Sequence, residues 1–201
     1  MPRVFLVDDQ AAVLKASARL LASADFSVDC FTCAQAFLDS GHADAPGCLV
    51  SDLCMPGMHG LALQQALTER GSLLPVIFLT GQGDIDAGVR AMKSGAVDFL
   101  TKPAHGERLI DAVRTAIDRN GQARLERARS RELQARLASL TPREREVLML
   151  VVAGKLNKQV ADVLGTAEKT VKIQRARVMS KMKAQSLADL VRLAARLDLA
   201  P

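Results

Sequence analysis

Residues 3–9 read Arg-Val-Phe-Leu-Val-Asp-Asp, so that four consecutive apolar side chains are followed at once by two carboxylates. A short unbroken apolar run of this kind is typical of a strand that is buried on both faces, as in the middle of a parallel sheet. The two carboxylates then stand at the carboxyl end of that strand. In open parallel sheets this edge is where binding sites gather. The stretch therefore predicts a fold class and also the edge at which a site would lie.

The same apolar pattern recurs along the first 119 residues and alternates with stretches of helical spacing. The strand-like runs are residues 3–7, 26–31, 48–51, 76–79 and 97–100. Strands that alternate with helices predict a parallel sheet with helices on both faces, joined by right-handed crossovers. We therefore expect an α/β domain with a doubly wound five-stranded sheet over residues 1–119.

Residues 139–201 carry no strand pattern and show helix start and stop signals instead. Thr141-Pro142-Arg143-Glu144 predicts a capping box with proline at the first helical position. A helix begins at this box, and further helices are expected over residues 158–164, 168–183 and 186–197, with a tight turn at Gly165. Four short helices with such a turn predict an all-α helix-turn-helix domain.

Between these two domains, residues 120–138 have an arginine-rich helical composition, which predicts a helical linker. The Asn120-Gly121 pair predicts a helix stop or kink at its start. Leu133, Leu137 and Leu140 follow at spacings of four and three. This segment fits either a solvated spacer or a helix that pairs with a second copy, since few of its heptad positions are apolar.

Charge is divided unevenly between the two halves of the chain. Residues 1–119 hold 10 Lys and Arg against 14 Asp and Glu, a net charge of −4, whereas residues 120–201 hold 17 against 8, a net charge of +9. A basic half indicates a polyanionic partner, because neutralised phosphates release counterions. The alternative is a basic face that is only solvated.

Composition excludes several classes of protein. The longest apolar stretches, such as residues 75–79, hold about five residues, whereas a membrane-spanning helix needs about 20. The start at residues 1–4 runs directly into a strand and does not resemble a signal peptide. The C-x-x-C pair Cys30 and Cys33 lacks the context of a redox motif, and the cysteines and histidines offer no zinc site. We expect a cytoplasmic protein.

Five polar side chains stand at the ends of the predicted strands: Asp8, Asp9, Asp52, Thr80 and Lys102. Because parallel strands end at one shared edge, we expect all five to meet there. Three converging carboxylates repel one another unless a hard cation lies among them, and Mg²⁺ prefers such oxygen ligands. The hydroxyl and the ammonium would bind the oxygens of a phosphoryl group, with Asp52 as its acceptor. A single aspartate at a strand end more often caps a turn, but five coincident positions favour a phosphoryl-transfer site.

The helix predicted over residues 168–183 has two distinct faces. One face is apolar and is expected to pack into the domain: Val171, Val178 and Met182. The other face presents two lysines with small or aliphatic side chains: Lys169, Lys172, Ile173 and Ala176. Such a face suits the major groove of DNA, where lysine reaches phosphate or guanine and isoleucine touches a thymine methyl. The alternative is a basic helix that serves only solubility.

Longer motifs surround the strand ends of the first domain. They are Leu6-Val7-Asp8-Asp9, the segment 51–60 (Ser-Asp-Leu-Cys-Met-Pro-Gly-Met-His-Gly), the segment 76–84 and the segment 95–103. Together they resemble the receiver domain of two-component response regulators. The resemblance implies a flavodoxin-like fold and a phosphoryl group that passes to Asp52 from a histidine kinase.

The same resemblance implies a role for each residue of the site. Asp8, Asp9 and Asp52 would hold Mg²⁺ with the backbone carbonyl of Cys54. Lys102, before a cis bond to Pro103, would pair with the phosphoryl oxygens. As a two-state switch, Thr80 would swing its hydroxyl toward the phosphate and Phe99 would turn inward behind it. Gly81, without a side chain, leaves the path to Thr80 open.

The second domain resembles the LuxR-type helix-turn-helix that ends regulators of the NarL/FixJ class, through Leu156-Asn157-Lys158-Gln159-Val160-Ala161 and Glu168-Lys169-Thr170-Val171-Lys172. The resemblance places three residues at base edges, namely Lys172, Ile173 and Ala176. It places three at the DNA backbone, namely Lys169, Thr170 and Arg177, and sets Asn157 and Lys158 against phosphate. Ala167 stands where a serine or threonine cap is usual, which costs about 1 kcal/mol unless the helix begins at Thr166.

These observations predict a transcriptional regulator that is switched by phosphorylation and is not an enzyme. Its expected partners are double-stranded DNA, a histidine kinase, RNA polymerase and, when phosphorylated, a second copy of the chain. Two helix faces are candidates for pairing: Ile85, Val89 and Met92 in the first domain, and Leu187, Leu190, Val191 and Ala194 in the last helix, where a core role is the alternative.

Two other functions compete with this prediction. One is a constitutive DNA-binding regulator whose first domain only dimerises. The other is a phosphohydrolase that works through an aspartyl phosphate, which would need a second aspartate two residues after Asp52, where this chain has Cys54.

Overall fold

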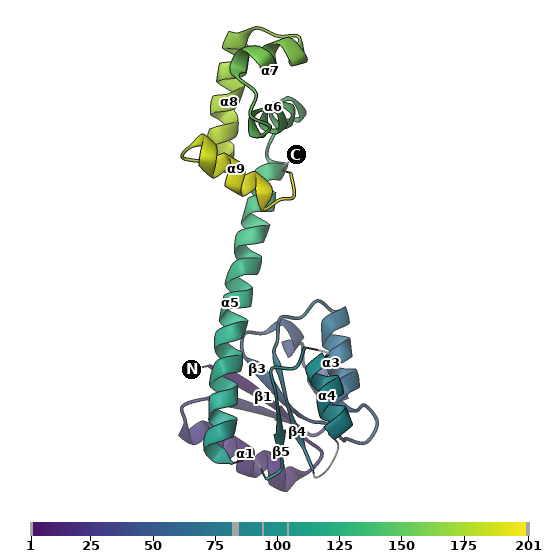
Figure 1. The fold of residues 1–201 in the computed structure, drawn as a ribbon. Coiled ribbons are helices and arrows are strands. Elements are labelled where there is room, and N and C mark those ends of the chain that lie inside the picture. The colour runs from purple at the N-terminus through teal and green to yellow at the C-terminus, as the bar shows by residue number, and fades with distance from the viewer. Residues whose placement is uncertain (1, 82–84, 94, 104, 200–201) are drawn as a thin grey trace. The chain divides into compact units, whose positions relative to one another are not determined.

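The computed structural model describes residues 2–81, 85–93, 95–103 and 105–199. Its amino-terminal part is a parallel sheet with helices on both faces (Figure 1). The strands are β1 (Arg3–Val7), β2 (Ser27–Phe31), β3 (Cys48–Asp52), β4 (Val76–Thr80) and β5 (Asp98–Thr101). The helices between them are α1 (Ala11–Ser23), α2 (Ala34–Asp39), the 3-10 helix η1 (His42–Asp44), α3 (Gly60–Glu69) and α4 (Ile85–Lys93). The predicted strands and the α/β architecture are confirmed.

Strand order across the sheet is β2-β1-β3-β4-β5. Val4 of β1 pairs with Val28 of β2 on one side and with Cys48 of β3 on the other. The direction of winding therefore reverses at β1. In such sheets the crevice above the carboxyl ends of the two central strands receives the ligand. Asp8 and Asp52 stand at this edge, directly after β1 and at the end of β3.

Each face of the sheet is covered by its own apolar core. Phe5 and Leu49 lie in the core that α2, α3 and α4 cover. Leu6 and Val50, their chain neighbours, lie in the core that α1 and α5 (Gly106–Ala138) cover. Successive residues of the central strands are thus buried on opposite faces, as expected for a sheet enclosed by helices.

The carboxyl-terminal part is helical and contains α6 (Pro142–Val152), α7 (Asn157–Leu164), α8 (Glu168–Met182) and α9 (Leu187–Ala195). The predicted capping box is present, because the Glu144 N–H donates to Thr141 Oγ1 (3.2 Å) and the Thr141 N–H donates to Glu144 Oε2 (2.9 Å). Gly165 ends α7 in the left-handed conformation that favours glycine, with φ of 60°. Ala167 is the residue before α8 and provides no side-chain cap, so the helix does not begin at Thr166. None of the helices in the described ranges combines the length and apolar character that crossing a membrane requires.

The chain divides into two compact units, Met1–Leu125 and Glu126–Pro201, and α5 contributes to both. This helix continues without interruption through Asn120-Gly121, where the sequence predicts a stop or kink. Asn120 is buried, and its side chain accepts a hydrogen bond from the N–H of Gly47 (3.1 Å) and donates to the carbonyl of Leu73 (2.6 Å). The asparagine therefore makes a tertiary contact and does not end the helix.

The leucines at the end of α5 and just after it lie in the core of the carboxyl-terminal unit. Leu133 and Leu140 are buried there, and Leu137 packs against the same cluster. The cluster also contains Leu148 of α6 and Val178 of α8. Neither alternative that the sequence left open describes these leucines, because they close the core of the helical unit.

Candidate functional site

Three carboxylates meet at the carboxyl edge of the sheet. Asp8 and Asp9 follow β1, and Asp52 is the last residue of the neighbouring strand β3. One oxygen from each carboxylate lies within 4.8 Å of the others. Asp8 and Asp52 are 3% and 4% exposed, whereas Asp9 is exposed. Buried oxygen donors at this spacing, beside one that water can reach, fit a hard divalent cation.

Lys102 lies between two of these carboxylates. Its Nζ is 2.6 Å from Asp8 Oδ2 and 3.2 Å from Asp52 Oδ1. The N–H of Lys102 donates to the carbonyl of Thr80 (2.6 Å), which ties the end of β5 to β4. The bond between Lys102 and Pro103 is cis. The structure thus brings the ammonium into direct contact with two of the predicted metal ligands.

Opposing effects set the electrostatics of this site. Burial raises the pKa of Asp52 and the Asp8 carboxylate adds to the shift, while Lys102 and the N–H of Cys54 oppose it without cancelling it. For Lys102, burial alone would lower the pKa, but the hydrogen bond to Asp8 and the charges of both carboxylates outweigh burial and raise it. Positive charge at this edge therefore offsets only part of the cost of burying the Asp52 carboxylate.

Gly60, at the start of α3, also belongs to the site, although the sequence pattern assigns it no separate role. A Cβ atom at this position would lie 2.5 Å from the backbone oxygen of Asp52 and 2.9 Å from the Phe78 ring. The N–H of Gly60 donates to the carbonyl of Leu53 (2.9 Å). Only glycine permits so close an approach of two backbones. The glycine ends the quoted motif 51–60, but a sequence does not show what a Cβ would meet.

Thr80 and Phe99, the expected switch pair, lie on neighbouring strands. Thr80 is buried, and its hydroxyl donates to the carbonyl of Gly81 (3.0 Å). A Cβ on Gly81 would meet nothing within 4 Å, so the space beside Thr80 is open. Phe99 is half-buried, and its ring would lie 3.0 Å from a Cβ on Gly88 of α4. In this structure the Thr80 hydroxyl is therefore bonded locally, and the Phe99 ring packs where Gly88 has no side chain.

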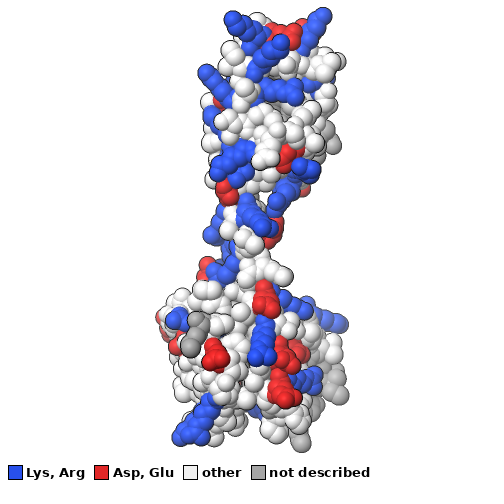
Figure 2. Space-filling model, turned by 90° about the vertical axis from the view of Figure 1, so that its left-hand side faces the viewer, with Lys and Arg blue, Asp and Glu red and all other residues white. Residues whose placement is uncertain are grey.

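The faces of α8 are divided as its periodicity predicts. Val171, Val178 and Met182 are fully buried. The α8 residues predicted to contact DNA are all exposed: Lys169, Thr170, Lys172, Ile173, Ala176 and Arg177. Ile173 is 49% exposed although it is apolar. Figure 2 shows Lys and Arg side chains gathered at the end of this unit where α7 and the start of α8 lie.

The first residues of α7 complete the predicted DNA contacts. Lys158 is exposed, whereas Asn157 is half-buried. Asn157 Oδ1 accepts a hydrogen bond from Arg175 Nη1 of α8 (3.0 Å). The residue before the helix, Leu156, provides no side-chain cap for the first turn. Arg175 is absent from the predicted contacts, because its link to Asn157 joins residues that are far apart in sequence.

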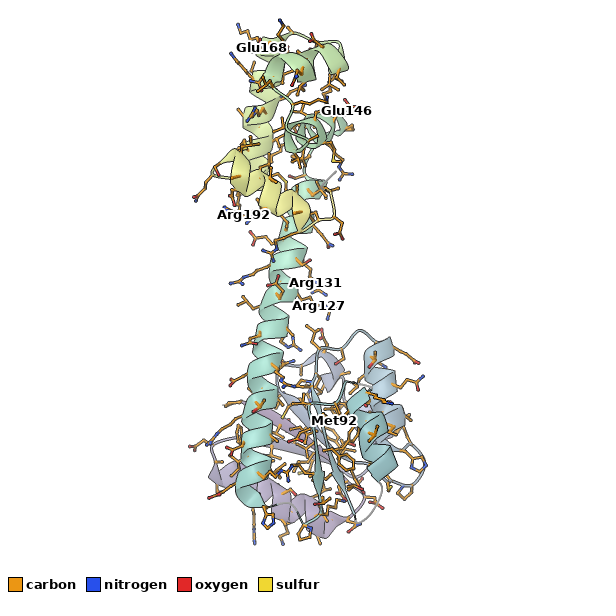
Figure 3. All side chains as sticks on the ribbon, viewed as in Figure 1. Met92, Arg127, Arg131, Glu146, Glu168 and Arg192 are labelled. Atoms are coloured by element: carbon orange, nitrogen blue, oxygen red, sulfur yellow. The ribbon has the colours of Figure 1, made fainter. Side chains whose placement is uncertain are left out.

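An exposed apolar face is present on α4. Val89 and Met92 are each 47% exposed, and Figure 3 labels Met92 on this helix. The side chain of Ile85, the third residue of the predicted face, lies outside the described part of the structure. The described side chains thus present apolar surface to solvent where pairing is predicted.

The apolar stripe of α9 is divided between two environments. Leu190 and Ala194 are buried in the core of the unit. Leu187 and Val191 are exposed. The stripe therefore contributes to the core and also leaves apolar side chains on the surface.

Both parts of the chain match described protein families. Residues 4–114 match the response regulator receiver domain, and residues 138–194 match the luxR family of bacterial regulatory proteins. The response regulator protein TodT of Pseudomonas putida is 45% identical over 194 residues, which cover 96% of this chain and 86% of that protein. The transcriptional regulatory protein FixJ of Azorhizobium caulinodans is 46% identical over 199 residues, which cover 98% of this chain and 94% of that protein.

Solved structures show the same combination of domains. The response regulator StyR is similar with a TM-score of 0.89 and 44% identity, over 97% of this chain and 98% of that chain. Full-length FixJ from B. japonicum is similar with a TM-score of 0.61 and 41% identity, over 100% of this chain and 98% of that chain. From its two domain matches and its relatives, the chain belongs to the NarL/FixJ class of two-component response regulators, which are transcriptional regulators that join a receiver domain to a LuxR-type DNA-binding domain.

Proposed function

We propose that Asp52 of this response regulator accepts a phosphoryl group from a histidine kinase, and that the phosphorylated chain regulates transcription by binding DNA through α8. The observation that carries the proposal is the group of Asp8, Asp9 and Asp52 oxygens within 4.8 Å, with the Lys102 ammonium against two of them. A half-open acidic site beside a fixed ammonium is what phosphoryl transfer to a carboxylate requires.

The proposed transfer would use side chains at the carboxyl edge of the sheet. An oxygen of Asp52 attacks phosphorus, so that a P–O bond forms as the P–N bond of a phosphohistidine breaks and the imidazole leaves. Lys102, 3.2 Å from Asp52, would neutralise the phosphoryl oxygens. The Thr80 hydroxyl would exchange its bond to the Gly81 carbonyl for one to phosphate, and Phe99 would move with it.

Asp8, Asp9 and Asp52, together with the carbonyl of Cys54, are the residues that would hold Mg²⁺. The donors are carboxylate oxygens, which suit this ion, and Asp9 is open to water. When bound, the ion would supply charge that stabilises the phosphoryl oxygens during transfer. Asp8 is held in place because its Oδ1 accepts a hydrogen bond from the N–H of Gln10 (2.9 Å).

On the DNA side, we assign the exposed residues of α8 to two kinds of contact. Lys172, Ile173 and Ala176 would meet base edges in the major groove. The DNA backbone would be met by the remaining predicted residues: Lys169, Thr170, Arg177, Asn157 and Lys158. The net charge of +9 over residues 120–201 supports a phosphate-bearing partner.

The remaining assignments concern partners and domains. We assign residues 1–119 to the receiver, 120–138 to the linker and 139–201 to the DNA-binding domain. Phosphorylation would favour a homodimer through the exposed apolar side chains of α4 or α9. A regulator that binds promoters would act in the cytoplasm and contact RNA polymerase there.

Mass spectrometry of the intact protein tests the central step. Incubation with acetyl phosphate and Mg²⁺ should add one phosphoryl group to the parent chain, and Asp52→Asn should take up none because its amide is not a nucleophile. Asp39→Asn is the matched control. Asp39 is an exposed aspartate of α2, and its side chain accepts a hydrogen bond from the Gln35 side chain. Equal labelling of the parent and the Asp52 variant would refute the assignment.

A further inference from the structure

Arg175 on α8 is a half-buried cation with an unusual partner. Arg143 and Lys181, the other half-buried cations of helices α6–α9, each contact a glutamate carboxylate, at 2.8 Å and 2.6 Å. Arg175 instead donates to the amide oxygen of Asn157 at 3.0 Å. Within the described ranges, no carboxylate forms an ion pair with it.

An amide oxygen orients a guanidinium without neutralising it. The guanidinium of Arg175 has five N–H donors in a planar fork, and the bond to Asn157 uses a donor on Nη1. The charge stays uncompensated in a half-buried position, where attraction to an anion is stronger than in bulk water. The complement of such a fork is a pair of phosphate oxygens, which arginine binds in bidentate fashion.

The position of Arg175 adjoins the surface that we propose for DNA. Arg175 follows Lys172 by three residues on α8, so their side chains are neighbours on the helix surface. Its partner Asn157 is the first residue of α7 and precedes Lys158. The hydrogen bond therefore joins the two helices of the helix-turn-helix beside two of the proposed contacts.

We infer that Arg175 contacts the DNA backbone and that Asn157 is a positioning residue that holds its guanidinium toward phosphate. The inference rests on the proposed DNA-binding function and adds a residue to it. It also gives the Asn157 side chain a specific role in the phosphate contact that the sequence predicts for Asn157 and Lys158.

A backbone contact is testable without knowledge of the operator, because it does not depend on base sequence. The probe is a fluorescein-labelled duplex of mixed sequence and about three helical turns, titrated by anisotropy across salt concentrations. Arg175→Gln keeps a donor for Asn157 but removes the charge. We expect the slope of log affinity against log salt to fall by about 0.9, so that the affinity ratio between about 50 and 200 mM salt shrinks about 3.5-fold. Arg175→Lys should keep most of the slope.

Arg192→Ala is the matched control for net charge. Arg192 is an exposed arginine on α9, labelled in Figure 3, and lies outside the proposed DNA contacts. Its removal should leave the slope within error of the parent value. A drop equal to that of Arg175→Gln would show that the slope reports net charge alone, and would overturn the inference.

Asn157→Ala tests the positioning role, because it keeps the cation and removes its partner. It should weaken binding severalfold in the parent chain and have little effect in an Arg175→Gln background, since the two residues act as one unit. If Asn157→Ala weakens DNA binding by the same factor in both backgrounds, the positioning role is overturned.

Thermal melts of each variant separate binding from folding. A purely structural bond would lower the melting temperature and leave the salt slope unchanged, which overturns the inference. If Arg175→Gln does not fold, the test rests on Asn157→Ala alone. An affinity of Asn157→Ala for the duplex equal to that of the parent would then reject the proposal. If the parent chain itself shows no salt-dependent binding to the duplex, the proposed DNA-binding function fails instead.

Discussion

The Glu144 carboxylate forms hydrogen bonds both at the start of α6 and with a residue near the end of α8. It accepts the Thr141 N–H in the capping box, and the same Oε2 accepts from Lys181 Nζ at 2.6 Å. The side chain is buried, and Lys181 also donates to the carbonyl of Ser139 (3.0 Å). A residue that the sequence identifies as a helix cap thus also links α8 to the segment before α6.

This arrangement predicts a pH dependence of stability. The hydrogen bond from Lys181, followed by those of Thr141, holds the pKa of Glu144 below its ordinary value. A depressed carboxyl pKa stabilises the fold at pH values above the ordinary pKa, and this contribution is lost as pH falls through the folded-state pKa. Glu144→Gln should therefore have a lower melting temperature than the parent at pH 7, and this difference should shrink as pH falls below the ordinary glutamate pKa of 4.5.

Glu146→Gln is the control for this measurement, because Glu146 is an exposed glutamate on the same helix, labelled in Figure 3, and its ion pair with Arg143 (2.8 Å) lies at the surface, where such pairs contribute little to stability. Its melting temperature should follow the parent closely at every pH. If the difference in melting temperature between the parent and Glu144→Gln stays constant from pH 7 to pH 3, the pH-dependent contribution of Glu144 is contradicted.

Gly60 and Gly121 provide a matched pair of single-residue tests. A Cβ on Gly60 would collide with the Asp52 backbone oxygen, whereas a Cβ on Gly121 in α5 would meet nothing within 4 Å. Gly60→Ala should destabilise the protein by roughly 1–3 kcal/mol through overpacking and slow labelling of Asp52 by acetyl phosphate. Gly121→Ala should be neutral or stabilise by up to about 1 kcal/mol. Urea denaturation measures both, and equal stabilities would show that the close approach at Gly60 is not a constraint.

At the scale of elements, the helix α5 contributes side chains to two different cores. Its first turns contribute Leu109, Val113 and Ala116 to the core beneath the receiver sheet. Its middle is fastened by polar contacts, since Arg124 Nε donates to Asn120 Oδ1 (3.0 Å) and its Nη2 donates to the carbonyl of Asp44. The last turns carry the leucines that close the core of the helical unit.

Two leucines of α5 test this division of the helix. Leu133 is buried in the core of the helical unit, whereas Leu125 is 52% exposed. Leu133→Ala should cost roughly 2–5 kcal/mol through the cavity it leaves, and hydrogen exchange of the α6 amides should speed up accordingly. Leu125→Ala, the control on the same helix, should leave exchange in α6 unchanged. Similar exchange in both variants would mean that the end of α5 is only a spacer.

For the molecule as a whole, charge and core formation follow the same division. The acidic part contains the carboxylate site and the two cores of the sheet, and the basic part contains the third core and the proposed DNA surface. Each unit therefore has an apolar core of its own. The relatives TodT and FixJ match across both parts, over 96% and 98% of this chain.

The sequence alone determined the features that depend on local spacing. The alternation of strands and helices, the carboxylates at the strand ends, the capping box at Thr141 and the two faces of α8 were all predictable, because a strand repeats every two residues and a helix every 3.6. That the carboxylates share one edge also follows, since parallel strands end together.

Only the tertiary structure decided the contacts between residues that are distant along the chain. Asn120 bonds Gly47 across 73 residues, Arg175 meets Asn157 across 18, and Gly60 is required by a backbone oxygen of β3. A local pattern predicts Asn120-Gly121 to end a helix, because in isolation the pair favours a turn. Inside the fold, the buried amide has partners in two separate loops, and satisfying them outweighs that weak local preference.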